Sequence, residues 1–167
     1  MSDAPPRLAV RALILQRDRL LLVNAYPGHD SDLWCAPGGG VARHFSLPAN
    51  LTREVAEETG LKIAVGPLVL VNEFHDPDID LHQVDLFFRC RVVGGALDSG
   101  SDPEGIVNRH RWVGRDELPT LRHKPDALGH AAWGTEAGGD TGSDTGTDMG
   151  GGAPPGAIYD PLERLVR

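Results

Sequence analysis

The chain has 167 residues with 40% hydrophobic and 24% charged side chains, values typical of a single globular domain. Its formal net charge of −8 argues against a general nucleic-acid binder, because such proteins are usually basic. No apolar run approaches the roughly 20 residues of a membrane-spanning helix, and the two cysteines, which form no C-x-x-C pair, predict neither a zinc site nor a disulfide framework.

The amino-terminal part of the chain is expected to form strands. Residues 8–15 are strand-like, residues 20–23 are apolar, and the polar triplet at 17–19 between them predicts a hairpin. A short strand is expected at 34–36, closed by a Pro-Gly-Gly-Gly loop at 37–40. The N-terminus lacks a basic region followed by an apolar stretch, so we expect no secretory signal and interpret the protein as cytoplasmic.

A helix is predicted over residues 47–59. Ser46 is a favourable N-cap, Pro48 is tolerated in a first turn, and Gly60 suits the position just after a helix. The large apolar residues recur every four positions and define the expected buried face: Leu47, Leu51 and Val55.

Strands dominate the rest of the domain. Residues 62–65 and 68–74 are expected to form two strands, because a Gly-Pro pair separates them. Apolar and charged residues alternate over 84–92, which predicts a strand with one buried face. A last strand is expected at 109–113 and a helical turn at 116–119. The coarse class is therefore α+β, with one central helix.

The carboxyl-terminal part of the chain differs in composition. Residues 134–156 hold 9 of the 21 glycines and almost no large apolar side chains, so they are predicted to be a low-complexity linker. Residues 157–167 regain apolar character, and they either dock on the domain or serve a partner. We therefore assign residues 1–133 to one folded domain.

Three carboxylates gather on the predicted helix. Glu54, Glu57 and Glu58 are spaced i, i+3 and i+4, so their side chains lie on one patch. Such a run is most often a solvated surface. Here a glycine-rich loop precedes the helix and Arg53 adjoins the first glutamate, and clustered hard oxygen ligands are what Mg²⁺ prefers.

This stretch resembles the Nudix box, G-x5-E-x7-R-E-U-x-E-E-x-G-U, where U is a bulky apolar residue. Eight of the nine specified positions match. The one departure is Phe45, which stands where the family has a glutamate. The matching residues are Gly39, Arg53, Glu54, Val55, Glu57, Glu58, Gly60 and Leu61.

The resemblance implies the Nudix α/β/α sandwich around a mixed sheet, and a Mg²⁺ cofactor with Mn²⁺ as the alternative. Glu57 and Glu58 would be the main metal ligands, and Glu54 a further ligand or the group that positions the attacking water. The Gly39 carbonyl would also bind the metal, and Arg53 would orient the glutamates. Family members hydrolyse a phosphoanhydride bond in a nucleoside diphosphate linked to another moiety.

Other site residues are candidates only. In some relatives the general base comes from a later loop, which makes Glu104 the candidate here, against the alternative of a solvated loop residue. Arg43 and His44 precede the helix and are placed to meet a substrate phosphate, or are plain surface residues. The aromatic candidates to stack a base are Tyr26, Trp34, Phe74 and Phe87, although most aromatics are needed in the core.

Phe45 leaves the activity itself open, because a phenyl ring cannot bind Mg²⁺. The leading hypothesis is an active hydrolase of a small phosphorylated substrate, such as a nucleotide, sugar nucleotide or dinucleotide. The alternative is a catalytically weak or silent nucleotide sensor or partner-binding module on the same fold. Removal of oxidised nucleotides is a third hypothesis, and a homodimer is an open alternative for the assembly.

Overall fold

The computed structural model describes residues 4–26, 32–98, 102–134 and 158–164, the last of these by its backbone. Among these residues no helix is long and apolar enough to cross a membrane. The strands are β1 (Arg7–Gln16), β2 (Arg19–Asn24), β3 (Trp34–Cys35), β4 (Gly38–Gly40), β5 (Leu61–Asp76), β6 (Leu81–Gly95), β7 (His110–Gly114) and β8 (Ile158–Arg164); the helices are α1 (Leu47–Thr59) and α2 (Leu128–Trp133), with 3-10 turns at Pro77–Ile79 and Leu118–Thr120.

The strands form one mixed sheet in the order β3-β2-β1-β6-β5-β8, with β4 also paired to β1 and β7 to β2. The long β5 and β6 run antiparallel, whereas β1 lies parallel to β6. Since β1 pairs with β2, β4 and β6, it stands at the centre of the sheet.

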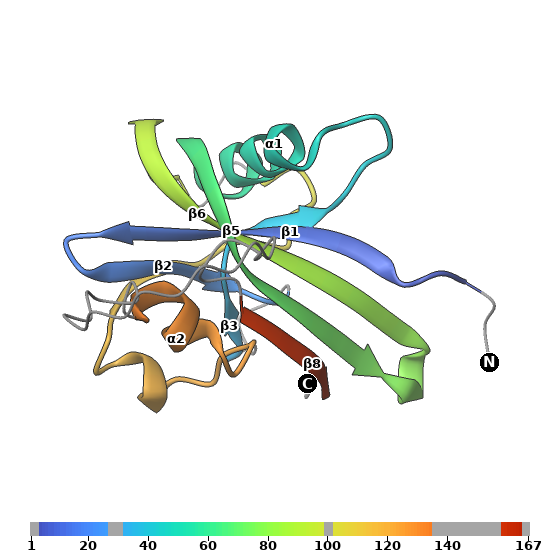
Figure 1. Cartoon of the computed structure of the whole chain (residues 1–167). Coiled ribbons are helices and arrows are strands. Elements are labelled where there is room, and N and C mark those ends of the chain that lie inside the picture. Colours follow the sequence, from blue (N-terminus) through green and yellow to red (C-terminus); the bar gives the residue numbers. More distant parts are fainter. Residues whose placement is uncertain (1–3, 27–31, 99–101, 135–157, 165–167) are drawn as a thin grey trace, which may run out of the picture.

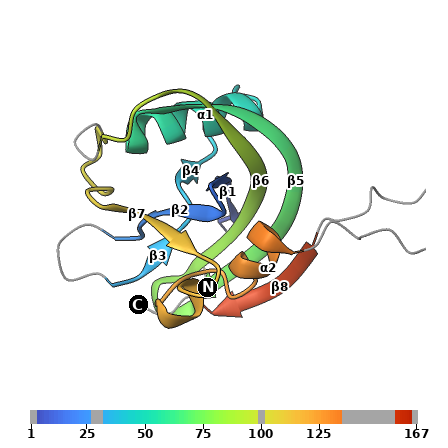
Figure 2. The same cartoon turned by 90° about the vertical axis from the view of Figure 1, so that its left-hand side faces the viewer.

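The sheet separates two hydrophobic cores, and a helix covers each face (Figure 1). On one side Leu51 and Val55 of α1, both fully buried, pack on Val10 and Ile14 of β1. On the other side Leu13, Phe87, Leu128 and Trp133 belong to the core beneath α2. Figure 2 shows α1 and α2 on opposite sides of the strands. The expected α/β/α sandwich around a mixed sheet is confirmed.

The central helix has the predicted bounds. The Ser46 side chain accepts a hydrogen bond from the Ala49 N–H at 3.2 Å, and Gly60 takes a left-handed conformation with φ of 73° at the other end. Both ends are therefore set by local chemistry, and the apolar stripe then fixes which face of the helix meets the sheet.

Three sequence expectations about strands were wrong. The glycines at 38–40 are not a loop, because their backbone pairs with Ala9–Arg11 of β1. The strands expected at 62–65 and 68–74 are one strand, since a register shift between Val65 and Leu68 absorbs the Gly-Pro pair. The strand over 84–92 forms, but its charged positions do not make one exposed face, since Arg91 is exposed whereas Asp85 is only 2% exposed.

The carboxyl-terminal segment docks on the domain. β8 pairs with β5 in parallel, with Val71 opposite Tyr159. The predicted linker at 134–156 lies outside the described residues except for Gly134, so the division into a domain, a linker and a terminal segment stays a prediction.

Candidate active site

The first feature of the site is the contact between α1 and the glycine strand β4. The Gly38 N–H donates a 2.8 Å hydrogen bond to a carboxylate oxygen of Glu58. A Cβ added at Gly39 would lie 2.2 Å from Oε2 of Glu54, so this carboxylate rests directly on the Gly39 backbone. The two glutamates therefore reach the glycine turn, and a side chain at Gly39 would displace the Glu54 carboxylate from its present position.

Arg53 organises the exposed side of the same patch. Its guanidinium donates hydrogen bonds to Glu57 at 2.8 Å and to Glu54 at 2.5 Å. These two bonds restrict the orientation of both carboxylates. The guanidinium also lies over the Phe45 ring, 5.9 Å from its centroid. Where the family has a glutamate beside this arginine, the present chain therefore has a cation–π contact.

Asn50 joins the glycine strand to the helix. This fully buried residue accepts from the Ala42 N–H at 2.9 Å and donates to the Gly40 carbonyl at 3.0 Å. Both halves of its amide are thus used to hold the segment that leads from β4 into α1. Asn50 was not singled out from the sequence, because a polar residue in an amphipathic helix is usually exposed.

Replacement of Asn50 by alanine should destabilise the fold by about 2–4 kcal/mol, because two buried backbone groups lose their partners. Urea unfolding monitored by tryptophan fluorescence measures the effect. Thr52→Ala is the control: its hydroxyl bonds the Pro48 carbonyl on an exposed face of the same helix, so the loss should stay below about 1 kcal/mol. Equal losses of unfolding free energy in the two variants would show that the hydrogen bonds of Asn50 do not stabilise the junction between β4 and α1.

Glu58 is the most perturbed carboxylate of the group. Burial raises its pKa to about 7, and the charges of Glu54 and Asp102 add to the rise, while Arg11 and the Gly38 N–H oppose it. A buried carboxylate beside a second one binds cations favourably, since a cation relieves both the burial and the repulsion. This property is typical of functional sites.

Arg11 connects the glutamates to a cavity in the sheet. Its guanidinium donates to the Gly38 carbonyl at 2.9 Å and to Asp85 at 3.3 Å. Burial is the largest single influence and lowers the pKa of Arg11, but the charges of Asp85, Cys35 and Glu58 and the hydrogen bond to Asp85 together raise it overall. Gly38 thus bonds Glu58 through its N–H and Arg11 through its carbonyl, so the cavity begins one peptide unit from the carboxylates.

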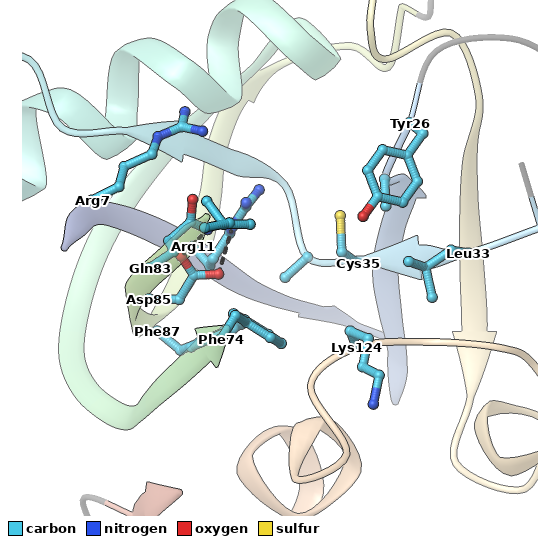
Figure 3. A pocket seen from close by; sticks show the side chains of 13 residues that line it. Arg7, Arg11, Tyr26, Leu33, Cys35, Phe74, Gln83, Asp85, Phe87 and Lys124 are labelled. Carbon is cyan, nitrogen blue, oxygen red and sulfur yellow. Dashed lines mark hydrogen bonds and ion pairs between the residues drawn. The ribbon is translucent and has the colours of Figure 1, made fainter. Parts of the chain in front are cut away.

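The cavity has a volume of about 180 Å³. Figure 3 shows Arg7, Arg11, Gln83 and Asp85 along one side, with Tyr26 on the other. Its walls mix aromatic and aliphatic side chains with a few polar groups, which is the usual make-up of a small-molecule site. The lining residues are Arg7, Arg11, Ala25, Tyr26, Leu33, Cys35, Ala36, Phe74, Leu81, Gln83, Asp85, Phe87 and Lys124.

The remaining predicted site residues lie apart from this cavity. Arg43 and His44 are exposed on the turn before α1 and do not line it. Glu104 is exposed, and its backbone N–H donates to the Asp102 carboxylate at 2.9 Å. Asp102 is the residue of that loop whose charge acts on Glu58. The roles of these three residues stay predictions.

The oxygen donors beside β4 suit a divalent cation. They comprise the carboxylates of Glu54 and Glu58 and the backbone of Gly39, with Glu57 on the exposed side of the same helix, and hard oxygen ligands of this kind match Mg²⁺. Within the described residues, however, no three His, Cys, Asp or Glu side chains already surround one point. The carboxylates suit the ion chemically, but Glu54 and Glu57 are paired with Arg53. Their side chains would therefore have to change orientation to bind one ion together.

A mixed sheet between two helical layers, with a glutamate helix resting on a glycine strand, defines a Nudix-type domain. The family model described as NUDIX domain matches residues 5–133. The chain therefore belongs to the Nudix hydrolase family.

Curated relatives resemble the same region. The ADP-ribose pyrophosphatase of Methanocaldococcus jannaschii is 31% identical over 97 residues, covering 58% of this chain and 57% of the relative. The MutT-like protein of Streptomyces ambofaciens is 29% identical over 119 residues, covering 70% and 71%. YjhB from Bacillus subtilis is 28% identical over 122 residues, covering 71% of this chain and 55% of the relative. The chain therefore spans little more than half the length of some curated relatives that it matches.

Solved structures share the fold. A NUDIX hydrolase from Nitrosomonas europaea aligns with a TM-score of 0.65 at 23% identity, covering 76% of this chain and 86% of that one. An ADP-ribose pyrophosphatase from Streptococcus suis aligns with a TM-score of 0.59 at 24% identity, covering 95% and 100%. At these identities the likeness establishes the architecture.

Proposed function

We propose that the protein hydrolyses the phosphoanhydride bond of a nucleoside diphosphate linked to another moiety, with Mg²⁺ or Mn²⁺ as its cofactor. One observation carries the proposal: Glu58 accepts from the Gly38 N–H and Glu54 rests on Gly39, while the Gly38 carbonyl accepts from Arg11, which lines the cavity. Carboxylates and cavity thus adjoin, which is the arrangement needed to present a metal-bound diphosphate to a nucleophile.

Each residue has a defined part in this reaction. Glu54, Glu57 and Glu58 would hold the metal, which when bound neutralises phosphoryl oxygens and makes water more acidic. Arg53 fixes the orientation of Glu54 and Glu57 through its two hydrogen bonds. A glutamate of this group, or a carboxylate of the loop at 102–109, would accept the proton from the attacking water.

The cavity would receive the nucleoside part of the substrate. The Arg7 guanidinium lies against Gly40, where an added Cβ would meet it at 2.8 Å, and supplies positive charge at the end of the cavity nearest the carboxylates. This charge offsets the repulsion between an anionic substrate and a chain of net charge −8. The aromatic residues Tyr26, Phe74 and Phe87 line the remainder.

The test is a substrate screen with the purified full chain, Mg²⁺ or Mn²⁺, and a panel of ADP-ribose, nucleotide sugars, dinucleotides and nucleoside triphosphates. Product formation from at least one nucleoside-diphosphate derivative is expected, with loss of turnover in Glu57→Gln. Equal turnover by the wild type and Glu57→Gln on every compound would overturn the proposal. The same panel, extended to oxidised triphosphates, tests the nucleotide-cleansing hypothesis.

Phe45 favours a second candidate, a nucleotide-binding module with little or no turnover. The ring contacts Arg53 in place of a carboxylate and is 52% exposed, so the site has one acidic group fewer than the family pattern. Calorimetry separates the two functions, because a binding module takes up nucleotide tightly and forms no product.

Replacement of Phe45 by glutamate should strengthen divalent-cation binding, because it adds a carboxylate beside Arg53 and the helix glutamates. We expect roughly a tenfold lower Kd for Mn²⁺, since ligand charge tunes such sites. Mn²⁺ titration followed by electron paramagnetic resonance measures it. Phe45→Ala removes the ring without adding a charge and should leave the Kd unchanged; the same Kd in both variants would contradict the expectation.

A further inference from the structure

The side-chain amide of Gln83 is held in one orientation inside the cavity. Its nitrogen donates a 2.7 Å hydrogen bond to one oxygen of Asp85, and Arg11 donates to the other oxygen of that carboxylate at 3.3 Å. A carboxylate only accepts, so the amide nitrogen must be the atom that faces Asp85. The chain Arg11–Asp85–Gln83 therefore fixes which edge of the amide is donor and which is acceptor.

Half of this amide is left for a ligand. Gln83 lines the cavity, and its bond to Asp85 is the only side-chain hydrogen bond it makes to a residue that the structure describes. One N–H of the amide nitrogen and the amide oxygen thus remain for a ligand, in a cavity whose walls are both polar and apolar. Gln83 is 8% exposed, so these groups meet a partner only within the cavity. Unpaired polar groups in such a site favour a ligand that satisfies both of them.

Aromatic surface adjoins the amide. Phe74 of β5 stands directly opposite Gln83 in the ladder, and Phe87 lies on the same face of β6 four residues on. Both rings line the cavity and are at most 5% exposed. A flat heteroaromatic ring would contact these apolar side chains while its edge reaches the amide.

We propose that Gln83, held by Asp85, selects adenine as the base of the substrate. A glutamine amide pairs with the amino group and the ring nitrogen on the N6/N7 edge of adenine, which offers one donor and one acceptor. The same edge of guanine or hypoxanthine offers two acceptors and leaves the amide oxygen unpaired. This inference rests on the proposed function and names its substrate class, an adenosine-diphosphate derivative such as ADP-ribose.

The test compares kcat/KM for ADP-ribose with kcat/KM for inosine-diphosphate-ribose, which differ only in the group at position 6 of the purine. The wild type should prefer ADP-ribose by roughly 10- to 100-fold, the usual discrimination of a bidentate base contact. Gln83→Met keeps the length of the side chain without the amide and should bring the ratio to about one. Gln16→Met, the same change at an exposed end of β1, should keep the wild-type ratio.

A second readout keeps the inference separate from turnover. Calorimetric titration of the full chain with AMP and with IMP should give tighter binding of AMP in the wild type and equal binding in Gln83→Met. If neither ADP-ribose nor inosine-diphosphate-ribose is hydrolysed but AMP is preferred, the proposed function fails and the base assignment stands. Equal kcat/KM or equal affinity for the two purines in the wild type, or an unchanged ratio in Gln83→Met, would overturn the assignment. Gln83→Asn, which withdraws the amide by one methylene, replaces Gln83→Met if the latter does not fold.

Discussion

Replacement of Glu58 by glutamine should lower kcat/KM by about 10³-fold or more, while making the metal-free protein more stable. Activity falls because a metal-binding carboxylate is lost, and metal ions contribute several kcal/mol to such reactions. The fold is retained, because a glutamine oxygen still accepts from the Gly38 N–H. Opposite effects on activity and stability are typical of a residue kept for function.

The stability gain depends on pH in a defined direction. Burial raises the pKa of Glu58 in the folded protein to about 7, above the ordinary value of 4.5. The folded state therefore binds this proton more tightly than the unfolded state, and the metal-free wild type loses stability as pH rises from 4.5 to 7. Well above pH 7, Glu58→Gln should be more stable by about 3 kcal/mol, and near pH 4.5 the difference should become small.

Thermal unfolding in EDTA at several pH values measures this difference, and turnover of the hydrolysed substrate measures the loss of activity. Glu57→Gln is the comparator, because its carboxylate is 36% exposed and paired with Arg53. It should lose activity without gaining stability. A pH-independent difference between Glu58→Gln and the wild type would contradict the account of Glu58.

Replacement of Arg11 by methionine should destabilise the protein by about 3 kcal/mol or more. Asp85 is 3% exposed at its side chain, and without the guanidinium it would be a buried charge with only Gln83 as a partner. The Gly38 carbonyl also loses its donor. Both effects act on the segment that links the cavity to the glutamates, so substrate turnover should fall as well.

Urea unfolding of a double-mutant cycle separates the charge effect from the packing effect. Arg11→Met combined with Asp85→Leu should recover most of the lost stability, because no unpaired charge remains. The matched control is Arg19→Met, which removes an exposed ion pair with Glu117 and should cost less than about 1 kcal/mol. Similar losses for Arg11→Met and Arg19→Met would refute the proposed buried pair.

The sequence predicted those parts of the molecule whose signals are local. The bounds of α1 follow from Ser46 and Gly60, whose capping roles depend on neighbouring residues alone. The hairpin of β1 and β2 likewise follows from two apolar runs around a polar turn. The Nudix box identified the family because its residues stand at fixed spacings within one loop and one helix.

Features that depend on distant partners were not predictable. The alternating pattern predicts that Asp85 faces solvent, but the fold buries it beside Arg11, which is 74 residues away in the sequence. The glycines of β4 have low strand propensity, but the central strand β1 supplies a partner edge. Gly38 fits this pairing because an added Cβ would lie 2.1 Å from the Val10 carbonyl oxygen.

The roles of the predicted site residues stay predictions, and the structure bears only on where their side chains lie. Glu54 and Glu58 reach the glycine strand as expected, whereas Arg53 draws Glu57 to the exposed side of the helix. The contact between Arg53 and Phe45 had no signal in the sequence, because the family pattern specifies a carboxylate at that position.

Mn²⁺ binding to the substrate-free protein, followed by electron paramagnetic resonance, tests most directly whether the helix carboxylates share a cation. The account predicts saturable binding to the wild type that is weakened at least tenfold in each of Glu54→Gln, Glu57→Gln and Glu58→Gln, with no change in Glu73→Gln on β5. Wild-type affinity retained in all three helix variants would contradict it.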